Sequence, residues 1–121
     1  SEREGFAYSL AYALLHGAHE ILEVPLTDLN ATVGSAAAGS DCEIVLYDNV
    51  PGGAGLVARL EDPAWLRRCM ELARDRVQGT CGCEPSTSCY GCLRSYANQF
   101  IHPSLARGPV QQYLEQLLAR W

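Results

Sequence analysis

The chain has 121 residues, of which 48% are hydrophobic and 19% are charged, so we expect one globular domain that spans residues 1–121. Its formal net charge of -5 argues against a stand-alone protein that grips the phosphate backbone of nucleic acids. It has no apolar run long enough to span a bilayer, and its polar first residues lack the pattern of a signal peptide. We therefore expect no membrane contact and a cytoplasmic location.

The first predicted element is a helix over residues 4–23. Apolar residues recur every four positions along it, and a second row of apolar residues widens the stripe. Both of its sides are therefore rather apolar, which predicts a well-buried helix, and Pro25 is expected to end it. The two rows consist of Phe6, Leu10, Leu14, Ala18 and Leu22, and of Ala7, Ala11, Leu15 and Ile21.

Two short strands are predicted next, over residues 29–34 and 42–48. The second strand reads CEIVLYD, which is nearly all apolar and β-branched in its middle. The small-residue loop at 35–41 is short, and a short connection favours an antiparallel hairpin. A turn, NVPGGAG, is predicted at residues 49–55.

This glycine-rich turn lies between a strand and a stretch that looks helical over residues 54–61, and such a position can hold a phosphate at a helix N-terminus. It has neither a lysine nor a G-x-G-x-x-G pattern, so a structural turn formed by Gly52, Gly53 and Gly55 is the favoured interpretation. Asp48, at the end of the strand, is expected to cap a helix or to accept hydrogen bonds within the turn.

A second helix is predicted after this turn. Asp62 is expected to be its N-cap and Pro63 its first residue, and Gly79 is expected to stop it. Its predicted buried face consists of Trp65, Leu66, Cys69, Met70, Ala73 and Val77.

The C-terminal part is predicted to contain two further helices. A short one is expected over about 90–99, and the pair Gly108-Pro109 is expected to break the chain. The last helix is predicted over 109–121, where apolar residues recur at helical spacing. These residues are Val110, Tyr113, Leu114, Leu117, Leu118 and Trp121.

Four of the six cysteines, Cys81, Cys83, Cys89 and Cys92, lie close together with the spacing C-x-C, five residues, C-x-x-C. Two close pairs joined by a short turn supply the four soft tetrahedral ligands that zinc prefers. The predicted cofactor is therefore one structural Zn²⁺, because four thiolates leave no open position for catalysis. Disulfides and an iron–sulfur cluster remain alternatives, although a bridge within C-x-C is strained. The clustering also favours a reducing compartment.

The segments LYDNVPGGAGL at residues 46–56 and CLRSYANQFIH at residues 92–102, together with the cysteine spacing, resemble the MrfA-type zinc-binding domain. The resemblance covers nearly the whole chain and is most specific over residues 45–102. That domain lies at the C-terminus of a group of superfamily-two DNA helicases and occurs in the DrmB component of the DISARM anti-phage system. The resemblance implies helicase motor domains in the same chain or in a partner, because this chain has neither a GK[ST] phosphate loop nor a DEAH-like box.

Several other polar residues are assigned structural roles. His16 and His19 lie three residues apart on the first predicted helix, but no third ligand is evident, so packing or surface roles are favoured. Cys42 and Cys69 are expected to be small buried hydrophobic residues. His102 matches a histidine of the family motif, and we expect it to form a hydrogen bond that holds its loop.

Direct contact with DNA would depend on residues beside the cysteines. Tyr90 and Arg94 flank the cysteine segment, and a tyrosine can stack on a base. The other main basic residues are expected on the solvated surface, as is common for such residues. They are Arg67, Arg68, Arg74, Arg76 and Arg107.

These observations predict an α+β domain in which a small antiparallel sheet is packed by four or five helices and one zinc ion clips the chain. The predicted function is that of a structural accessory module of an ATP-dependent DNA helicase, acting in DNA repair or anti-phage defence, without an enzymatic activity of its own. One alternative is a module that binds single-stranded DNA directly. Another is an enzyme that uses the glycine-rich turn with Asp48 and His102.

Overall fold

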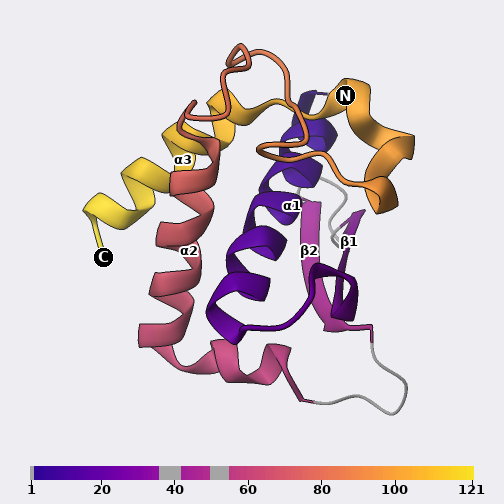
Figure 1. The fold of residues 1–121 in the computed structure, drawn as a ribbon. Coiled ribbons are helices and arrows are strands. Elements are labelled where there is room, and N and C mark those ends of the chain that lie inside the picture. Colours follow the sequence, from indigo (N-terminus) through magenta and orange to yellow (C-terminus); the bar gives the residue numbers. More distant parts are fainter. Residues whose placement is uncertain (1, 36–41, 50–54) are drawn as a thin grey trace.

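The computed structural model describes residues 2–35, 42–49 and 55–121 (Figure 1). Four helical segments of nine residues or more and a two-stranded antiparallel sheet confirm the α+β class. In chain order, the elements are α1 (Glu2–Leu22), the 3-10 helix η1 (Leu26–Asp28), β1 (Leu29–Ser35), β2 (Cys42–Asp48), the 3-10 helix η2 (Val57–Glu61), α2 (Pro63–Val77), the 3-10 helix η3 (Tyr96–Ser104) and α3 (Arg107–Ala119).

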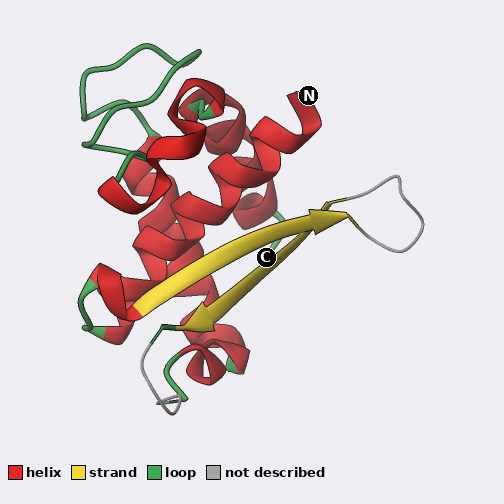
Figure 2. Ribbon diagram, turned by 90° about the vertical axis from the view of Figure 1, so that its right-hand side faces the viewer, coloured by secondary structure: helices red, strands yellow, loops and turns green. Residues whose placement is uncertain are grey.

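Helix α1 is the centre of the fold. It packs against α2 on one side and against the β1–β2 hairpin on the other, and α3 packs mainly on α2 (Figure 1). Seen from the side, the two strands cover one face of the helical part (Figure 2). This arrangement explains why α1 is apolar on both sides, as the sequence predicted. Its buried apolar residues are Ala7, Leu10, Ala11, Tyr12, Ala13, Leu15, Ala18 and Leu22.

Helix α1 ends with a reversal of the backbone at Glu23, which has a φ of 58°. The Val24 amide donates to the His19 carbonyl at 3.2 Å, the hydrogen bond of a helix end that closes with a left-handed residue. The helix therefore stops ahead of Pro25.

The contact between α1 and α2 is closest at Gly17. A Cβ atom at this position would lie 2.2 Å from the carbonyl oxygen of Cys69 and 3.2 Å from the amide nitrogen of Ala73. The Cys69 side chain is itself buried beside this crossing, and burial raises the pKa of its thiol to about 12. Cys69 is thus a small buried residue, as predicted, and only glycine fits opposite its backbone.

The hairpin pairs β1 with β2 in antiparallel register, with Leu29 opposite Asp48 and Ser35 opposite Cys42. Ile44 and Leu46 of β2 pack toward the core, whereas Val45 and Tyr47 are exposed. The nearly continuous apolar sequence of this strand therefore does not mean burial on both faces, since the described elements cover only one side of the sheet. The side chain of Cys42 lies outside the described residues.

The C-terminal third corrects two boundary predictions. The short helix expected at about 90–99 is wrong in its position, because residues 90–93 form a turn and η3 begins after Ser95. Ser95 is the N-cap of η3, and its amide donates to Asn98 Oδ1 at 2.7 Å. His102 lies within this 3-10 helix rather than in a loop.

Gly108-Pro109 does not break the chain, which is the second correction. Both residues lie in the first turn of α3, where a missing proline N–H removes no hydrogen bond of the helix. Val110, Leu114 and Leu118 form the buried stripe of α3, whereas Tyr113 and Trp121, predicted to belong to it, are exposed.

His16 gives the fold a predicted dependence on pH. It is buried, and among the described residues its Nδ1 atom has no hydrogen-bond partner. Burial, reinforced by the nearby positive charge of Arg76 and by His19, lowers its pKa from 6.5 to about 3. The unfolded chain therefore binds a proton at His16 that the folded chain does not, so stability falls as the pH drops below 6.5.

We expect the free energy of unfolding to fall by about 2 kcal/mol more in the native chain than in a His16→Gln variant between about pH 7 and pH 5. Urea denaturation of both zinc-loaded proteins across this range measures the difference. Protons that compete for the cysteines affect both proteins alike, so parallel pH profiles would contradict the assignment.

Candidate metal centre

The four cysteines lie in the segment that joins α2 to η3, at one end of the helices (Figure 1). We call residues 79–94 the zinc loop. The four Sγ atoms all lie within 4.8 Å of one another; those of Cys81 and Cys83 are 3.5 Å apart, and those of Cys83 and Cys92 are 3.8 Å apart. A tetrahedral ion with metal–sulfur bonds of about 2.3 Å requires sulfur–sulfur distances of about 3.8 Å. The cluster therefore fits one ion, and its cysteines form no disulfides.

The ionisation of the thiols also fits a bound cation. Hydrogen bonding from the Cys83 backbone lowers the pKa of Cys81 to about 7, whereas burial raises the pKa of Cys92 to about 12. Burial, and then the neighbouring Cys81 thiol, raises the pKa of Cys83 as well. The Cys83 and Cys92 thiols become thiolates at neutral pH only if a bound cation displaces their protons.

The backbone of the zinc loop is folded tightly around the sulfurs. The Cys89 amide donates to Cys92 Sγ at 3.2 Å, and the amides of the three residues 92–94 all donate to the Cys89 carbonyl at 3.0–3.1 Å. A Cβ atom on Gly91 would lie 2.9 Å from that of Cys81, so the two cysteine pairs approach each other only because this residue is glycine. Gly82, with a φ of 91°, turns the backbone between Cys81 and Cys83.

Two arginines that the sequence placed on the solvated surface instead support the loop from outside. Arg76 Nε donates to the Cys92 carbonyl at 2.7 Å, and Arg107 donates to the Cys83 carbonyl through Nε at 3.1 Å and through Nη2. Arg107 is only 7% exposed, so its prediction as a surface residue is wrong. Each cysteine pair is thus held through the carbonyl of one ligand residue.

The family model described as MrfA Zn-binding domain matches residues 10–93, which is more than two thirds of the chain. The chain belongs to this family. The matched segment contains the whole cluster, so Cys81, Cys83, Cys89 and Cys92 form its zinc site. No curated protein and no solved structure matches the chain.

The family is a small zinc-binding domain. Bound zinc would supply a closed tetrathiolate centre that stabilises the fold, since four protein ligands leave no position for substrate. Within the described residues, no helix combines the length and apolar character of a membrane span.

Tyr90 and Arg94 belong to the zinc loop of this MrfA zinc-binding domain. The Tyr90 ring is 58% exposed and meets the His102 ring edge to face, with 5.4 Å between ring centroids. Arg94 Nε donates to the Ser88 hydroxyl at 2.9 Å.

His102 Nε2 forms hydrogen bonds with the Ser95 carbonyl at 3.0 Å and with Asn98 Oδ1 at 2.7 Å. His102 therefore holds its own segment, which is the role expected for it.

Asp48 has the hydrogen-bonding role that the sequence favoured. Its Oδ2 accepts from the Leu56 amide at 3.0 Å and its Oδ1 from the Val57 amide at 2.9 Å. These are the amides that a phosphate would use at the start of η2, so the carboxylate occupies that position. Gly55 has a φ of 68°, and Gly52 and Gly53 lie outside the described residues.

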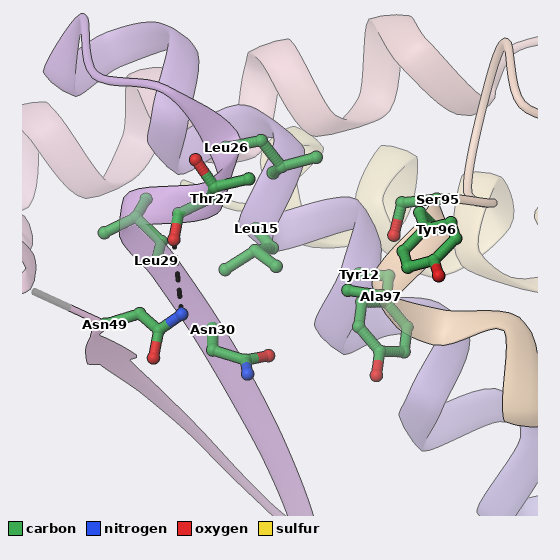
Figure 3. A pocket seen from close by; sticks show the side chains of 10 residues that line it. All are labelled: Tyr12, Leu15, Leu26, Thr27, Leu29, Asn30, Asn49, Ser95, Tyr96 and Ala97. Carbon is green, nitrogen blue, oxygen red and sulfur yellow. Dashed lines mark hydrogen bonds between the residues drawn. The ribbon is translucent and has the colours of Figure 1, made fainter.

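A pocket of about 260 Å³ lies away from the zinc site, between α1, the η1–β1 segment and the start of η3 (Figure 3). Its lining is mainly apolar, and one edge is held by Asn49 Nδ2, which donates to the Thr27 carbonyl at 3.2 Å. Tyr96, at the opposite edge, is 85% exposed. The lining residues are Tyr12, Leu15, Leu26, Thr27, Leu29, Asn30, Asn49, Ser95, Tyr96 and Ala97.

Proposed function

We propose that this chain is a structural zinc module that serves an ATP-dependent DNA helicase motor, in the same polypeptide or in a partner, in DNA repair or anti-phage defence. The observation that carries the proposal is the family match together with the four-cysteine cluster. The chain has no nucleotide-binding motif of its own, so the motor must be elsewhere. Its residues 1–121 act as one module, and the free cysteines suit a reducing cytoplasm.

The zinc loop and η3 carry exposed aromatic residues that are suited to contact a partner. Tyr90, Tyr96 and Phe100 expose 58%, 85% and 67% of their surfaces, and we call these three residues the aromatic surface. No aspartate or glutamate occurs between Pro85 and Leu114, although the whole chain carries a net charge of -5. Exposed aromatic rings without neighbouring carboxylates in sequence are typical of contact sites. We infer that this surface contacts the motor domains.

In the complete helicase, the double change Tyr96→Ala and Phe100→Ala is expected to lower ATP-dependent strand separation several-fold. Zinc content and melting temperature should remain unchanged, because both side chains are largely exposed. Tyr47→Ala, which removes a partly exposed ring from the hairpin, is the matched control and should leave strand separation intact. Equal strand separation by all three proteins would contradict a role for the aromatic surface.

Direct contact with single-stranded DNA is the second candidate, because Tyr90 lies exposed near Arg94, and tyrosine with arginine is a common pair for stacking and phosphate contact. Fluorescence anisotropy of a labelled single-stranded oligonucleotide with the zinc-loaded chain tests it. Binding that weakens with salt and is lost in Tyr90→Ala and Arg94→Ala would favour this candidate. Arg68→Ala removes an equal charge from the surface of α2 and serves as the control. If the chain does not bind the oligonucleotide at low salt, the module that contacts the motor domains remains the favoured function.

A further inference from the structure

Arg107 is a buried cation that forms no ion pair with a carboxylate in the described part of the chain. The residue is 7% exposed, and among the described residues its donors reach the carbonyls of Cys83 and Val77 and the Gln111 side-chain oxygen. The ion pairs of Arg67, Arg68 and Arg74 are on the surface of α2 and do not involve Arg107. Burying a guanidinium without an opposite charge nearby is strongly unfavourable, so a stable fold needs a compensating negative charge.

The position of Arg107 in its helix adds to this requirement. It is the first residue of α3, where the helix dipole is positive and disfavours a cation. The amides of Arg107 and Gly108 also face the zinc loop, since they donate to the carbonyls of Thr87 at 3.0 Å and Pro85 at 2.9 Å. The chain therefore directs two positive features, a guanidinium and a helix N-terminus, toward the same loop.

The zinc loop, which Arg107 contacts at the Cys83 carbonyl, can supply this negative charge when its metal is bound. No aspartate or glutamate occurs from Pro85 to Leu114, and Glu84, next to Cys83 in the loop, is exposed and forms no ion pair with Arg107 among the described residues. Four thiolates around one Zn²⁺ carry a net charge of about -2 by simple addition. Arg107 donates to the carbonyl of Cys83, one of these ligand residues. Gly79 leaves space for the guanidinium, since a Cβ atom on Gly79 would lie 3.2 Å from Arg107 Nη2.

We propose that Arg107 is the counter-charge of the zinc–thiolate centre, a positioning residue that raises zinc affinity by stabilising the negative charge of the four sulfurs. Arg76 makes similar contacts with the other cysteine pair, through the carbonyls of Cys92 and Tyr90. It is less buried than Arg107, so water screens its charge and its contribution is smaller.

Zinc affinity, measured with the complete chain by competition with a chelator, tests the proposal. Arg107→Gln is expected to weaken affinity about 10–100-fold, the range for residues that support metal ligands from outside. Arg76→Gln should have a smaller effect, and Arg68→Gln, which removes an equal charge from an exposed site on α2, should have almost none. Arg107→Lys keeps the charge but not the planar fork, so it should recover part of the affinity.

Cobalt substitution separates a charge effect from a purely structural one. Without the guanidinium, the sulfur electrons are held less tightly, so the sulfur-to-cobalt charge-transfer band of Arg107→Gln should move to longer wavelength, while that of Arg107→Lys stays near the native position. A lower melting temperature with unchanged zinc affinity and an unchanged band would overturn the proposal. If Arg107→Gln does not fold with metal, the test is made with Arg107→Lys instead. A native zinc affinity of Arg107→Lys together with a shifted cobalt band would also overturn the proposal.

Discussion

Replacing Cys92 with serine is expected to abolish stable zinc binding and to unfold the end of the molecule that contains the zinc loop. Cys92 is fully buried, and its sulfur accepts from the Cys89 amide within the cluster. Structural zinc binds with roughly 10–16 kcal/mol, which equals or exceeds the total stability of about 5–15 kcal/mol of an ordinary domain. Excess chelator should have the same effect on the native chain. Metal analysis and thermal melting by circular dichroism, with and without chelator, measure both results.

Cys69→Ser is the matched control for this experiment, because Cys69 is equally buried but lies between α1 and α2, outside the cluster. Its thiol donates to the Leu14 carbonyl at 3.5 Å, a contact that a serine hydroxyl can replace. One zinc per chain should therefore remain in this variant. A native melt for chelator-treated protein that holds no metal would show that the zinc is dispensable for the fold.

Gly17→Ala is expected to destabilise the domain by about 3 kcal/mol or more and to lower its melting temperature by about 10 °C. The added Cβ would lie 2.2 Å from the Cys69 carbonyl oxygen, and that atom belongs to the backbone of α2, so it cannot rotate away. Helix propensity alone predicts that this substitution stabilises the domain, because alanine in a helix is favoured over glycine by about 1 kcal/mol. Thermal melting of the zinc-loaded protein therefore decides between the two effects.

Gly34→Ala controls for the loss of a glycine in general. Gly34 lies in β1, and nothing stands within 4 Å of the position that its Cβ would take. We expect its melting temperature to change little or to rise slightly, because alanine loses less backbone freedom on folding. Equal melting temperatures for both glycine variants would show that α1 and α2 can separate without cost.

Local signals explain why much of the fold could be predicted from the sequence. The Asp62 cap is a good example, since its carboxylate accepts from the Ala64 amide at 2.8 Å, two residues along the chain. The cysteine spacing likewise depends on a short segment and gave the metal site. Gly79, with a φ of 103°, ends α2 at the predicted place. In each case the residue and its partner are close neighbours.

The predictions that failed depend on contacts between distant residues. Arg107 is buried because its partners are the carbonyls of Cys83 and Val77, which lie 24 and 30 residues earlier. The helix expected at 90–99 does not form at its start because the amides of residues 92–94 converge on the Cys89 carbonyl, a turn that brings the ligands together. Neither propensity nor periodicity contains this information.

The central position of α1 has a consequence for how the domain is made. Its two apolar sides are covered by the hairpin, which follows it directly, and by α2, which begins only at Pro63. During synthesis, which proceeds from the N-terminus, the hairpin can shield one side early while the side containing Gly17 waits for α2. A fragment that ends before α2 would therefore expose this second side to solvent and to other chains. The four cysteines are synthesised after α2, so zinc binding stabilises an arrangement whose N-terminal half has already formed.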